Sequence, residues 1–127
     1  MKICVDFDGT IVKHEYPGEP VKGAIETLKE INKAGHDIIL YTMRSGEQLF
    51  EAINFLNENG IVLYGINENK DQKKWTQSPK IYANYYIDDA AVGCPLIYPR
   101  NKRPYVKWSQ IRRILTRRGV LEWKSHQ

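Results

Sequence analysis

The first ten residues constrain the fold of this chain more than any other stretch. A short apolar run, Ile3–Val5, is followed at once by Asp-Phe-Asp-Gly-Thr at positions 6–10. An apolar run that is too short for a helix and is bounded by turn residues is typical of a strand buried on both faces. Two carboxylates therefore stand where this strand leaves the sheet. In open α/β sheets, ligands bind at that carboxyl edge.

The turn after this strand carries two aspartates in a short motif. Asp6 and Asp8 are two positions apart, so both can face one site if the backbone bends after Asp6. Gly9 permits a tight bend because it tolerates backbone angles that other residues avoid, and the Thr10 hydroxyl can tie the loop back to itself. Asp-Gly-Thr is also ordinary turn chemistry, but its place directly after an apolar strand favours a functional site.

The rest of the chain alternates between helical and extended patterns. Further strands are predicted at 37–42, 61–64, 85–87 and 96–98. Helices are predicted from Pro20 to Gly35, from Ser45 to Gly60 with Leu49, Phe50, Ile53 and Leu56 as its core face, at 81–84, and in the terminal segment around Trp108, Ile111 and Leu115. Strands joined through helices pair in parallel with right-handed crossovers. The pattern predicts an α/β fold, a three-layer α/β/α sandwich with a mostly parallel sheet and the Asp6 strand near its centre.

The 127 residues are expected to form a single domain, residues 1–127, because no linker, internal repeat or low-complexity tract divides them. The N-terminus lacks the apolar region of a signal peptide, and no stretch is long and apolar enough to span a membrane. A cytoplasmic protein with no membrane partner is therefore expected. Cys4 and Cys94 have no metal-ligand spacing and are expected to be reduced thiols.

Further polar residues stand at or near other strand ends. Thr42 ends the second predicted strand, Asp88 and Asp89 follow the fourth, and Lys80 precedes the fourth by a short segment. Parallel strands bring such ends to one edge of the sheet. Carboxylates that lie close together repel each other unless a cation sits between them, and oxygen ligands favour a hard cation such as Mg²⁺. The hydroxyl and ammonium groups suit the oxygens of a phosphate.

With these residues in view, the sequence resembles the haloacid dehalogenase superfamily, in its phosphatase branch. The resemblance extends from Lys2 to about Tyr98, and its motifs occur in the family's order: Asp6-Phe-Asp8-Gly-Thr10, Thr42, Lys80 and Asp88-Asp89. The first motif is highly specific, and the aspartate pair after Tyr-Tyr-Ile is moderately specific. Thr42 and Lys80 gain weight from their position only.

The resemblance implies catalytic roles for the first two aspartates. Asp6 would attack phosphorus and form an aspartyl-phosphate, and Asp8 would protonate the leaving oxygen and then deprotonate the attacking water. The resemblance also implies Mg²⁺ as the cofactor, bound by Asp6, by the Asp8 carbonyl and by one or both of Asp88 and Asp89. The sequence leaves open which of these last two is the direct ligand.

The same resemblance implies how the phosphoryl group is bound. Thr42 and Lys80 would hold its oxygens. The loop at Gly9 and Thr10 would assist through its N–H groups and its hydroxyl. Arg44, two residues after Thr42, is a further candidate for contact with the substrate, although a plain surface role fits it equally well. His14 lies in a polar loop, where a histidine is usually only solvated.

No segment is long enough to form the cap domain that many relatives carry, so the chain is expected to be capless. A lid excludes water and grips small substrates. Without one, walls must come from a neighbouring subunit of a homo-oligomer or from a large substrate. The phosphorylated substrate is accordingly expected to be a sugar or nucleotide monophosphate, or a phosphorylated nucleic-acid end.

Positive charge is concentrated near the C-terminus. The chain has a net charge of +4, yet Arg100–Arg118 contains eight lysines and arginines and no acidic residue. Basic residues interleaved with Tyr105 and Trp108 can bind a nucleic-acid backbone and stack on bases, whereas a solvated helix face with Trp108 in the core explains the same pattern. This basic helical segment, at about 100–120, supports an alternative function: a non-enzymatic module that binds nucleic acid or a protein partner. A response-regulator receiver domain is a more distant alternative, because its acidic residues follow a different order.

Overall fold

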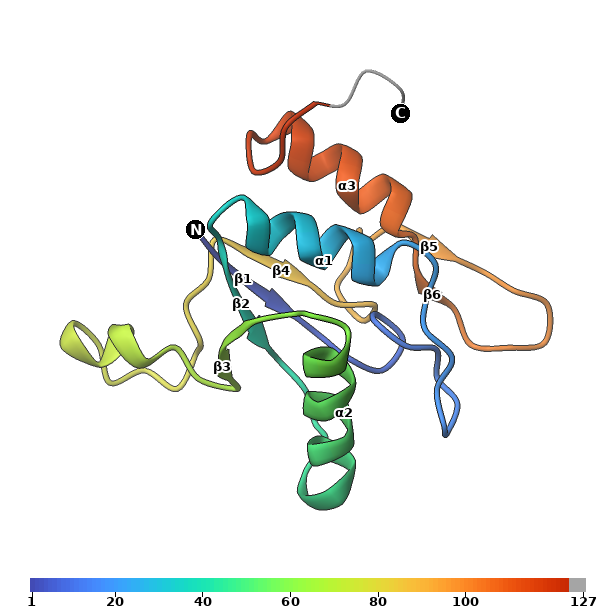
Figure 1. Ribbon diagram of the computed structural model, residues 1–127, viewed down its shortest axis with the longest axis horizontal. Coiled ribbons are helices and arrows are strands. Elements are labelled where there is room, and N and C mark those ends of the chain that lie inside the picture. Colours follow the sequence, from blue (N-terminus) through green and yellow to red (C-terminus); the bar gives the residue numbers. More distant parts are fainter. Residues whose placement is uncertain (124–127) are drawn as a thin grey trace.

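A four-stranded parallel sheet with strand order β3-β2-β1-β4 forms the centre of the computed structural model, which describes residues 1–123 (Figure 1). The elements, in chain order, are β1 (Lys2–Val5), α1 (Ala24–Lys33), β2 (Asp37–Leu40), α2 (Gly46–Glu58), β3 (Leu63–Ile66), the 3₁₀ helix η1 (Lys70–Lys74), β4 (Tyr85–Ile87), β5 (Leu96–Ile97), β6 (Tyr105–Val106) and α3 (Trp108–Arg117). β1 pairs in parallel with both β2 and β4, so the strand that carries the first motif lies inside the sheet, as predicted. The predicted α/β class, a parallel sheet flanked by helices, is confirmed, and residues 1–123 include no obvious cap.

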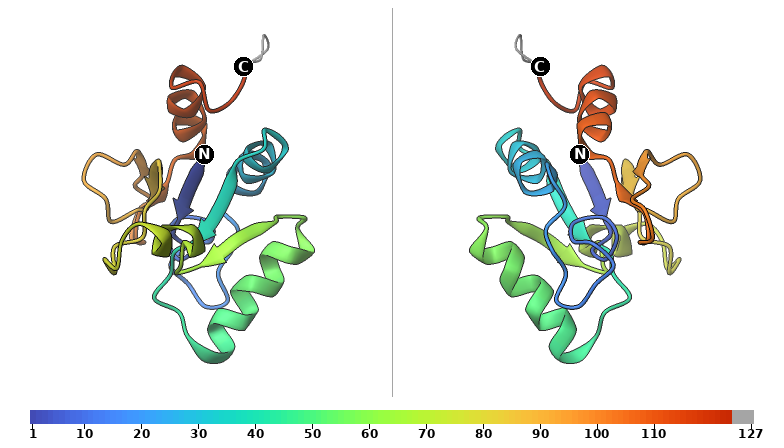
Figure 2. Two further views of the ribbon diagram at one scale, coloured as in Figure 1. Left: turned by 90° about the vertical axis from the view of Figure 1, so that its left-hand side faces the viewer. Right: turned by 90° about the vertical axis from the view of Figure 1, so that its right-hand side faces the viewer.

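The two faces of the sheet are covered unequally. Ile3 and Val5 of β1 join the main core with the buried residues of α1, α2 and α3, and α1 lies beside α3 (Figure 1). Cys4 and Ile39 point to the other face, where Ile81 and Ala83 pack against them. The side views place η1 across the sheet from α1 and α2 (Figure 2). That second layer is therefore thin, formed by one 3₁₀ turn and extended chain.

The short helix predicted at 81–84 is absent. The Tyr86 hydroxyl donates to the Ile81 carbonyl at 2.6 Å and accepts from the Ala83 N–H at 3.1 Å, and the Asn84 N–H donates to the Lys2 carbonyl at 2.7 Å. These contacts hold the segment extended across the sheet, because its backbone groups are satisfied by β1 and by a tyrosine instead of by a helical turn.

The predicted start of the first helix at Pro20 is also wrong. Pro20 forms a β-bridge with Val12, and the Val21 N–H donates to the Ile11 carbonyl at 2.8 Å. α1 begins only at Ala24, after Gly23 adopts a φ of 84°. An extended segment at Pro20 and Val21, here called the strap, therefore precedes the helix and pairs with the chain that follows the motif loop.

Two smaller predictions fail for reasons of packing. Phe50, predicted on the core face of α2, is 66% exposed, whereas Leu56 is buried as predicted and Ala52 is buried in addition. The third strand lies at Leu63–Ile66 instead of 61–64, because Ile61 is buried in the turn that follows α2.

The predicted strand at 96–98 does not join the main sheet. β5 pairs with β6 as an antiparallel hairpin of its own, a partner the sequence pattern did not indicate. α3 follows directly and buries Trp108, Ile111 and Leu115, as predicted. Cys4 and Cys94 are free thiols. Among residues 1–123, no helix has both the length and the apolar character needed to cross a membrane.

Candidate functional site

The motif after β1 forms a compact loop at the carboxyl edge of the sheet. The Phe7 carbonyl accepts the N–H groups of Thr10 at 3.2 Å and Ile11 at 2.8 Å. Gly9 has a φ of 80°, and a Cβ atom at this position would overlap with His14 Nε2 and Asp89 Oδ2. A glycine is therefore required here on two grounds, backbone conformation and space.

The C-terminal elements fix this loop from behind. The buried indole N–H of Trp108 donates to the Thr10 carbonyl at 2.7 Å, and the Val106 N–H donates to the Gly9 carbonyl at 3.0 Å. Trp108 is 1% exposed, so it is a core residue and offers no platform for base stacking. Local sequence patterns do not reveal either contact, because the partners are almost a hundred residues apart.

Three carboxylates meet beside the loop. Asp6, Asp88 and Asp89 each offer an oxygen, and these oxygens lie within 4.8 Å of one another. The Thr10 hydroxyl donates to Asp6 Oδ2 at 3.1 Å and accepts the Asp89 N–H at 3.2 Å, which links the first and last motifs. Burial, together with the charge of Asp88, raises the pKa of Asp6 to about 8.

These three side chains fit a divalent cation. The set is made of oxygen donors only, which suits a hard ion. Burial, followed by the negative charge of Asp88, opposes ionisation of Asp6, and a cation between the carboxylates would relieve both effects. Burial opposes ionisation of Asp89, but hydrogen bonds, chiefly from His14, lower its pKa below the ordinary value. The Asp8 carboxylate is not part of this group within residues 1–123.

Asp8 is instead paired with Arg44. The guanidinium donates from Nε to Oδ2 at 2.9 Å and from Nη2 to Oδ1 at 2.8 Å, a bidentate contact. Arg44 also lies over the Phe7 ring at 4.7 Å and donates to the Gln48 carbonyl at 3.0 Å. Its side chain, predicted as a candidate for substrate contact, is thus directed at a motif carboxylate and holds that carboxylate in one orientation.

Thr42 lies at the same edge and is 8% exposed. Its hydroxyl oxygen accepts the Arg44 N–H at 3.1 Å, which leaves the hydroxyl hydrogen able to donate to a phosphate oxygen. The Asn67 side chain donates to the Thr42 carbonyl at 2.9 Å and accepts its N–H at 2.8 Å. Asn67 itself has a φ of 52°, in the left-handed region where asparagine is tolerated. Sequence reasoning assigned this asparagine to a surface loop and missed its positioning contact.

His14 is the second residue whose role the sequence did not reveal. Its Nε2 lies 2.7 Å from Asp89 Oδ2, and both side chains are about 15% exposed, at 15% and 14%. The histidine is therefore not a solvated loop residue. It holds one of the three clustered carboxylates, as second-sphere histidines and carboxylates do around metal sites.

The structure does not bring the Lys80 side chain into this network. Lys80 is exposed, and its ammonium group makes no ion pair within the described part of the chain. Its backbone is anchored by Gln72, whose side-chain amide donates to the carbonyls of Ser78 and Lys80 at 3.2 and 2.9 Å. Ser78 and Pro79 line a small cavity together with Asn67. The segment therefore approaches the carboxyl edge next to the hydrogen bonds between Asn67 and Thr42.

Two comparisons place this geometry among known proteins. A conserved protein from Bacteroides thetaiotaomicron has a solved structure that is 37% identical in sequence and superimposes with a TM-score of 0.75, over 93% of this chain and 91% of that one. The chain belongs to the same family as this Bacteroides protein.

The second similarity is to a Bacillus cereus protein that is provisionally named a nucleotidase. It is 27% identical over 110 residues, which are 82% of this chain and 57% of that relative, so the chain spans just over half of the length of the curated relative it matches. No protein-family profile matches the sequence.

Proposed function

We propose that this protein is a Mg²⁺-dependent phosphatase of the haloacid dehalogenase type, which hydrolyses a phosphomonoester through an aspartyl-phosphate on Asp6. One observation carries the proposal: Asp6, Asp88 and Asp89 form a single carboxylate cluster, beside the buried Thr42, at the edge where β1 and β4 end. The resemblance of the motifs and the name of the Bacillus cereus relative point to the same chemistry.

In this mechanism Asp6 and Asp8 divide the work. An Asp6 carboxylate oxygen forms a bond to phosphorus as the bond from phosphorus to the ester oxygen breaks, and Asp8 donates its proton to that leaving oxygen. Asp8 then takes a proton from water, whose oxygen attacks phosphorus, so inorganic phosphate leaves and the Asp6 carboxylate is restored. Arg44 acts as a positioning residue, because its bidentate contact holds the ionised Asp8 carboxylate, the form that takes the proton from the attacking water, in one direction.

The remaining residues bind and orient. Asp6, Asp88 and Asp89 would hold the cation, with His14 and Thr10 fixing the direction of Asp89. A bound Mg²⁺ would supply the positive charge that lets an anionic nucleophile approach an anionic phosphate. Thr42 would donate its hydroxyl hydrogen to a phosphoryl oxygen. Lys80, whose side chain is exposed and outside this network, would have to turn toward the same group when the substrate binds.

The substrate proposed first is a nucleoside monophosphate. The name of the Bacillus cereus relative favours a nucleotide. In addition, no cap covers the carboxyl edge among residues 1–123, so a body larger than a sugar phosphate can be admitted.

The proposal is tested by phosphate release from a panel of nucleoside monophosphates, sugar phosphates and 5′-phosphorylated oligonucleotides, with Mg²⁺ and with chelator. We expect Asp6→Asn to reduce turnover by more than about 1,000-fold, since the nucleophile is removed. Asp37→Asn is the matched control: Asp37 opens β2 at the opposite edge of the sheet and pairs with Lys2. Metal-dependent release that survives in Asp6→Asn would exclude the covalent route.

A further inference from the structure

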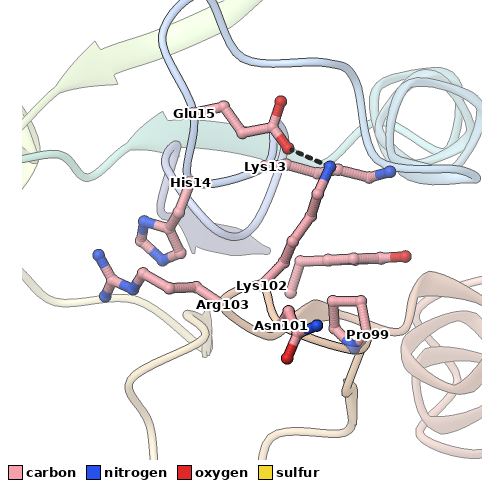
Figure 3. Close-up of a pocket in the computed structure, with 8 residues that line it drawn as sticks. Lys13, His14, Glu15, Pro99, Asn101, Lys102 and Arg103 are labelled. Atoms are coloured by element: carbon pink, nitrogen blue, oxygen red, sulfur yellow. Dashed lines mark hydrogen bonds and ion pairs between the residues drawn. The ribbon is translucent and has the colours of Figure 1, made fainter.

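A second cavity adjoins the carboxylate cluster. It has a volume of about 420 Å³ and lies between the loop after β1 and the β5–β6 hairpin loop, where it is lined by Lys13, His14, Glu15, Pro99, Asn101, Lys102, Arg103 and Tyr105 (Figure 3). His14 connects the two sites, because the histidine that lines the cavity is the one bonded to Asp89 at 2.7 Å. A molecule bound at the carboxylates could therefore extend past His14 into this cavity.

The cavity carries an excess of positive charge. Three of its lining residues are basic and one is acidic. Lys102 pairs with Glu15 at 3.3 Å, and Lys13 pairs with Glu19 at 3.2 Å and lies over the Tyr105 ring. These pairs account for two of the three cations.

Arg103 is the third cation, and it has no ion pair or hydrogen bond within residues 1–123. Figure 3 shows its guanidinium group beside the imidazole of His14, the histidine that is bonded to Asp89. A guanidinium presents a planar fork of donors that matches two oxygens of a phosphate, and such contacts are the strong ones. An arginine in this place is therefore suited to a second anion on the molecule whose phosphoryl group sits at Asp6.

The size of the cavity supports the same reading. A volume of 420 Å³ lies within the range of small-molecule sites and far exceeds a phosphate group, so it can take the body of a substrate as well. The ring of Tyr105 and the ring of Pro99 supply the apolar walls that such a body needs.

We propose that this cavity is the subsite for a second phosphate of the substrate, held by Arg103 with Lys102 beside it. This deepens the proposed function, on which it rests: the substrate class becomes a phosphomonoester that carries another phosphate a few bonds away. A nucleoside 3′,5′-bisphosphate and a 5′-phosphorylated oligonucleotide, with its next phosphodiester, share this chemistry.

The test measures the affinity of the Asp6→Asn protein for a nucleoside 5′-monophosphate, the matching 3′,5′-bisphosphate and a 5′-phosphorylated trinucleotide by isothermal titration calorimetry. We expect the two ligands with additional phosphates to bind at least about tenfold more tightly than the monophosphate, and Arg103→Ala in this background to remove most of that preference. Arg103→Lys should retain part of it, because the charge remains. Arg100→Ala is the matched control, since Arg100 is exposed in the same hairpin loop and does not line the cavity.

The outcomes separate the two proposals. A preference that does not depend on Arg103, or that Arg100→Ala lowers equally, overturns the subsite. If Arg103→Ala weakens the binding of the bisphosphate only, the subsite belongs to a small-molecule substrate. If it weakens the binding of the trinucleotide only, the subsite belongs to a nucleic-acid end. If the active protein releases no phosphate but binding still depends on Arg103, the subsite stands and the proposed hydrolysis fails. If the active protein releases phosphate but neither binding nor release depends on Arg103, the proposed hydrolysis stands and the subsite fails.

Discussion

Two arginine–carboxylate pairs with nearly the same geometry lie in different parts of this molecule. At the carboxyl edge, Arg44 grips Asp8 through two contacts of 2.8 and 2.9 Å. Between the helices, Arg112 of α3 grips Glu30 of α1 through contacts of 2.6, 3.0 and 3.2 Å. Both guanidinium groups are largely covered, with side-chain exposures of 9% and 11%. The contact itself therefore does not distinguish a site from a scaffold.

The surroundings make the difference. Asp8 belongs to the loop that Trp108 anchors, and Arg44 lies two residues after the buried Thr42, so that pair sits among the proposed reacting groups. Arg112 also contacts the Thr116 hydroxyl at 3.2 Å within its own helix, and its pair with Glu30 joins two helices. The sequence offered both arginines as surface or ligand-binding residues. The structure teaches that a basic side chain must be assigned by what its partner does.

The largest expected difference between the pairs is in activity. Arg44→Ala should lower kcat/KM by roughly 100-fold, because an unfixed Asp8 carboxylate is no longer held toward the reacting oxygens, and general acid–base catalysis contributes effects of this size. Arg112→Ala should change kcat/KM by less than about threefold at a temperature where the protein is folded. Steady-state phosphate release with the best substrate measures both.

A pH profile identifies the origin of the Arg44 effect. If Arg44 acts through Asp8, its removal shifts the pH dependence of kcat/KM, and Arg44→Lys restores part of the rate. A loss that appears only as a raised KM, with an unchanged pH profile, would instead mean that Arg44 binds the substrate directly, which is one of the two roles that the sequence leaves open.

The second difference is in stability. Arg112→Ala should lower the free energy of unfolding by about 2 kcal/mol, because it breaks a mostly covered ion pair between α1 and α3. Urea denaturation measures this, with Arg113→Ala as control, since Arg113 is exposed on the same helix. Equal losses from both variants would show that α3 is stabilised by its general charge and not by this pair.

The fold was predictable from local pattern because short apolar runs and helical stripes report burial directly. Ile3–Val5 and the stripe of the terminal helix required no knowledge of the rest of the chain. The errors fell where a distant partner overrides local preference: the extended segment at 81–84 is held by Lys2 and Tyr86, and the strap at Pro20 is held by Val12.

The same limit explains what could be predicted about the site. The clustering of Asp6, Asp88 and Asp89 could be predicted because each follows a strand, and the carboxyl ends of parallel strands lie at one edge of the sheet. The residues that orient them left no such signal: His14 meets Asp89 across 75 positions and Asn67 meets Thr42 across 25. Their side chains are ordinary loop residues until tertiary structure supplies the partner.

The smallest expected effect concerns Asp6, which, unlike Asp8 and Glu30, is not paired with an arginine in the described part of the chain. Within residues 1–123 no lysine or arginine pairs with Asp6, and burial beside Asp88 raises its pKa from 3.8 to about 8. The folded protein therefore binds this proton more tightly than the unfolded chain does. The resulting stabilisation is fully present below pH 3.8 and is lost as the pH rises toward 8.

Without metal, Tm should fall between pH 5 and pH 8 by more in the wild type than in Asp6→Asn. A cation in the cluster replaces the proton. A fixed Mg²⁺ concentration, ten times the Kd at pH 8, should therefore raise Tm by about 4 °C at pH 8 and by less at pH 5, where the proton competes with the ion. Thermal denaturation followed by circular dichroism measures these shifts. A Mg²⁺ shift that is equal at both pH values and persists in Asp6→Asn would place the ion outside the carboxylate cluster, and the contrast between paired and unpaired carboxylates would then not explain where this protein needs a metal.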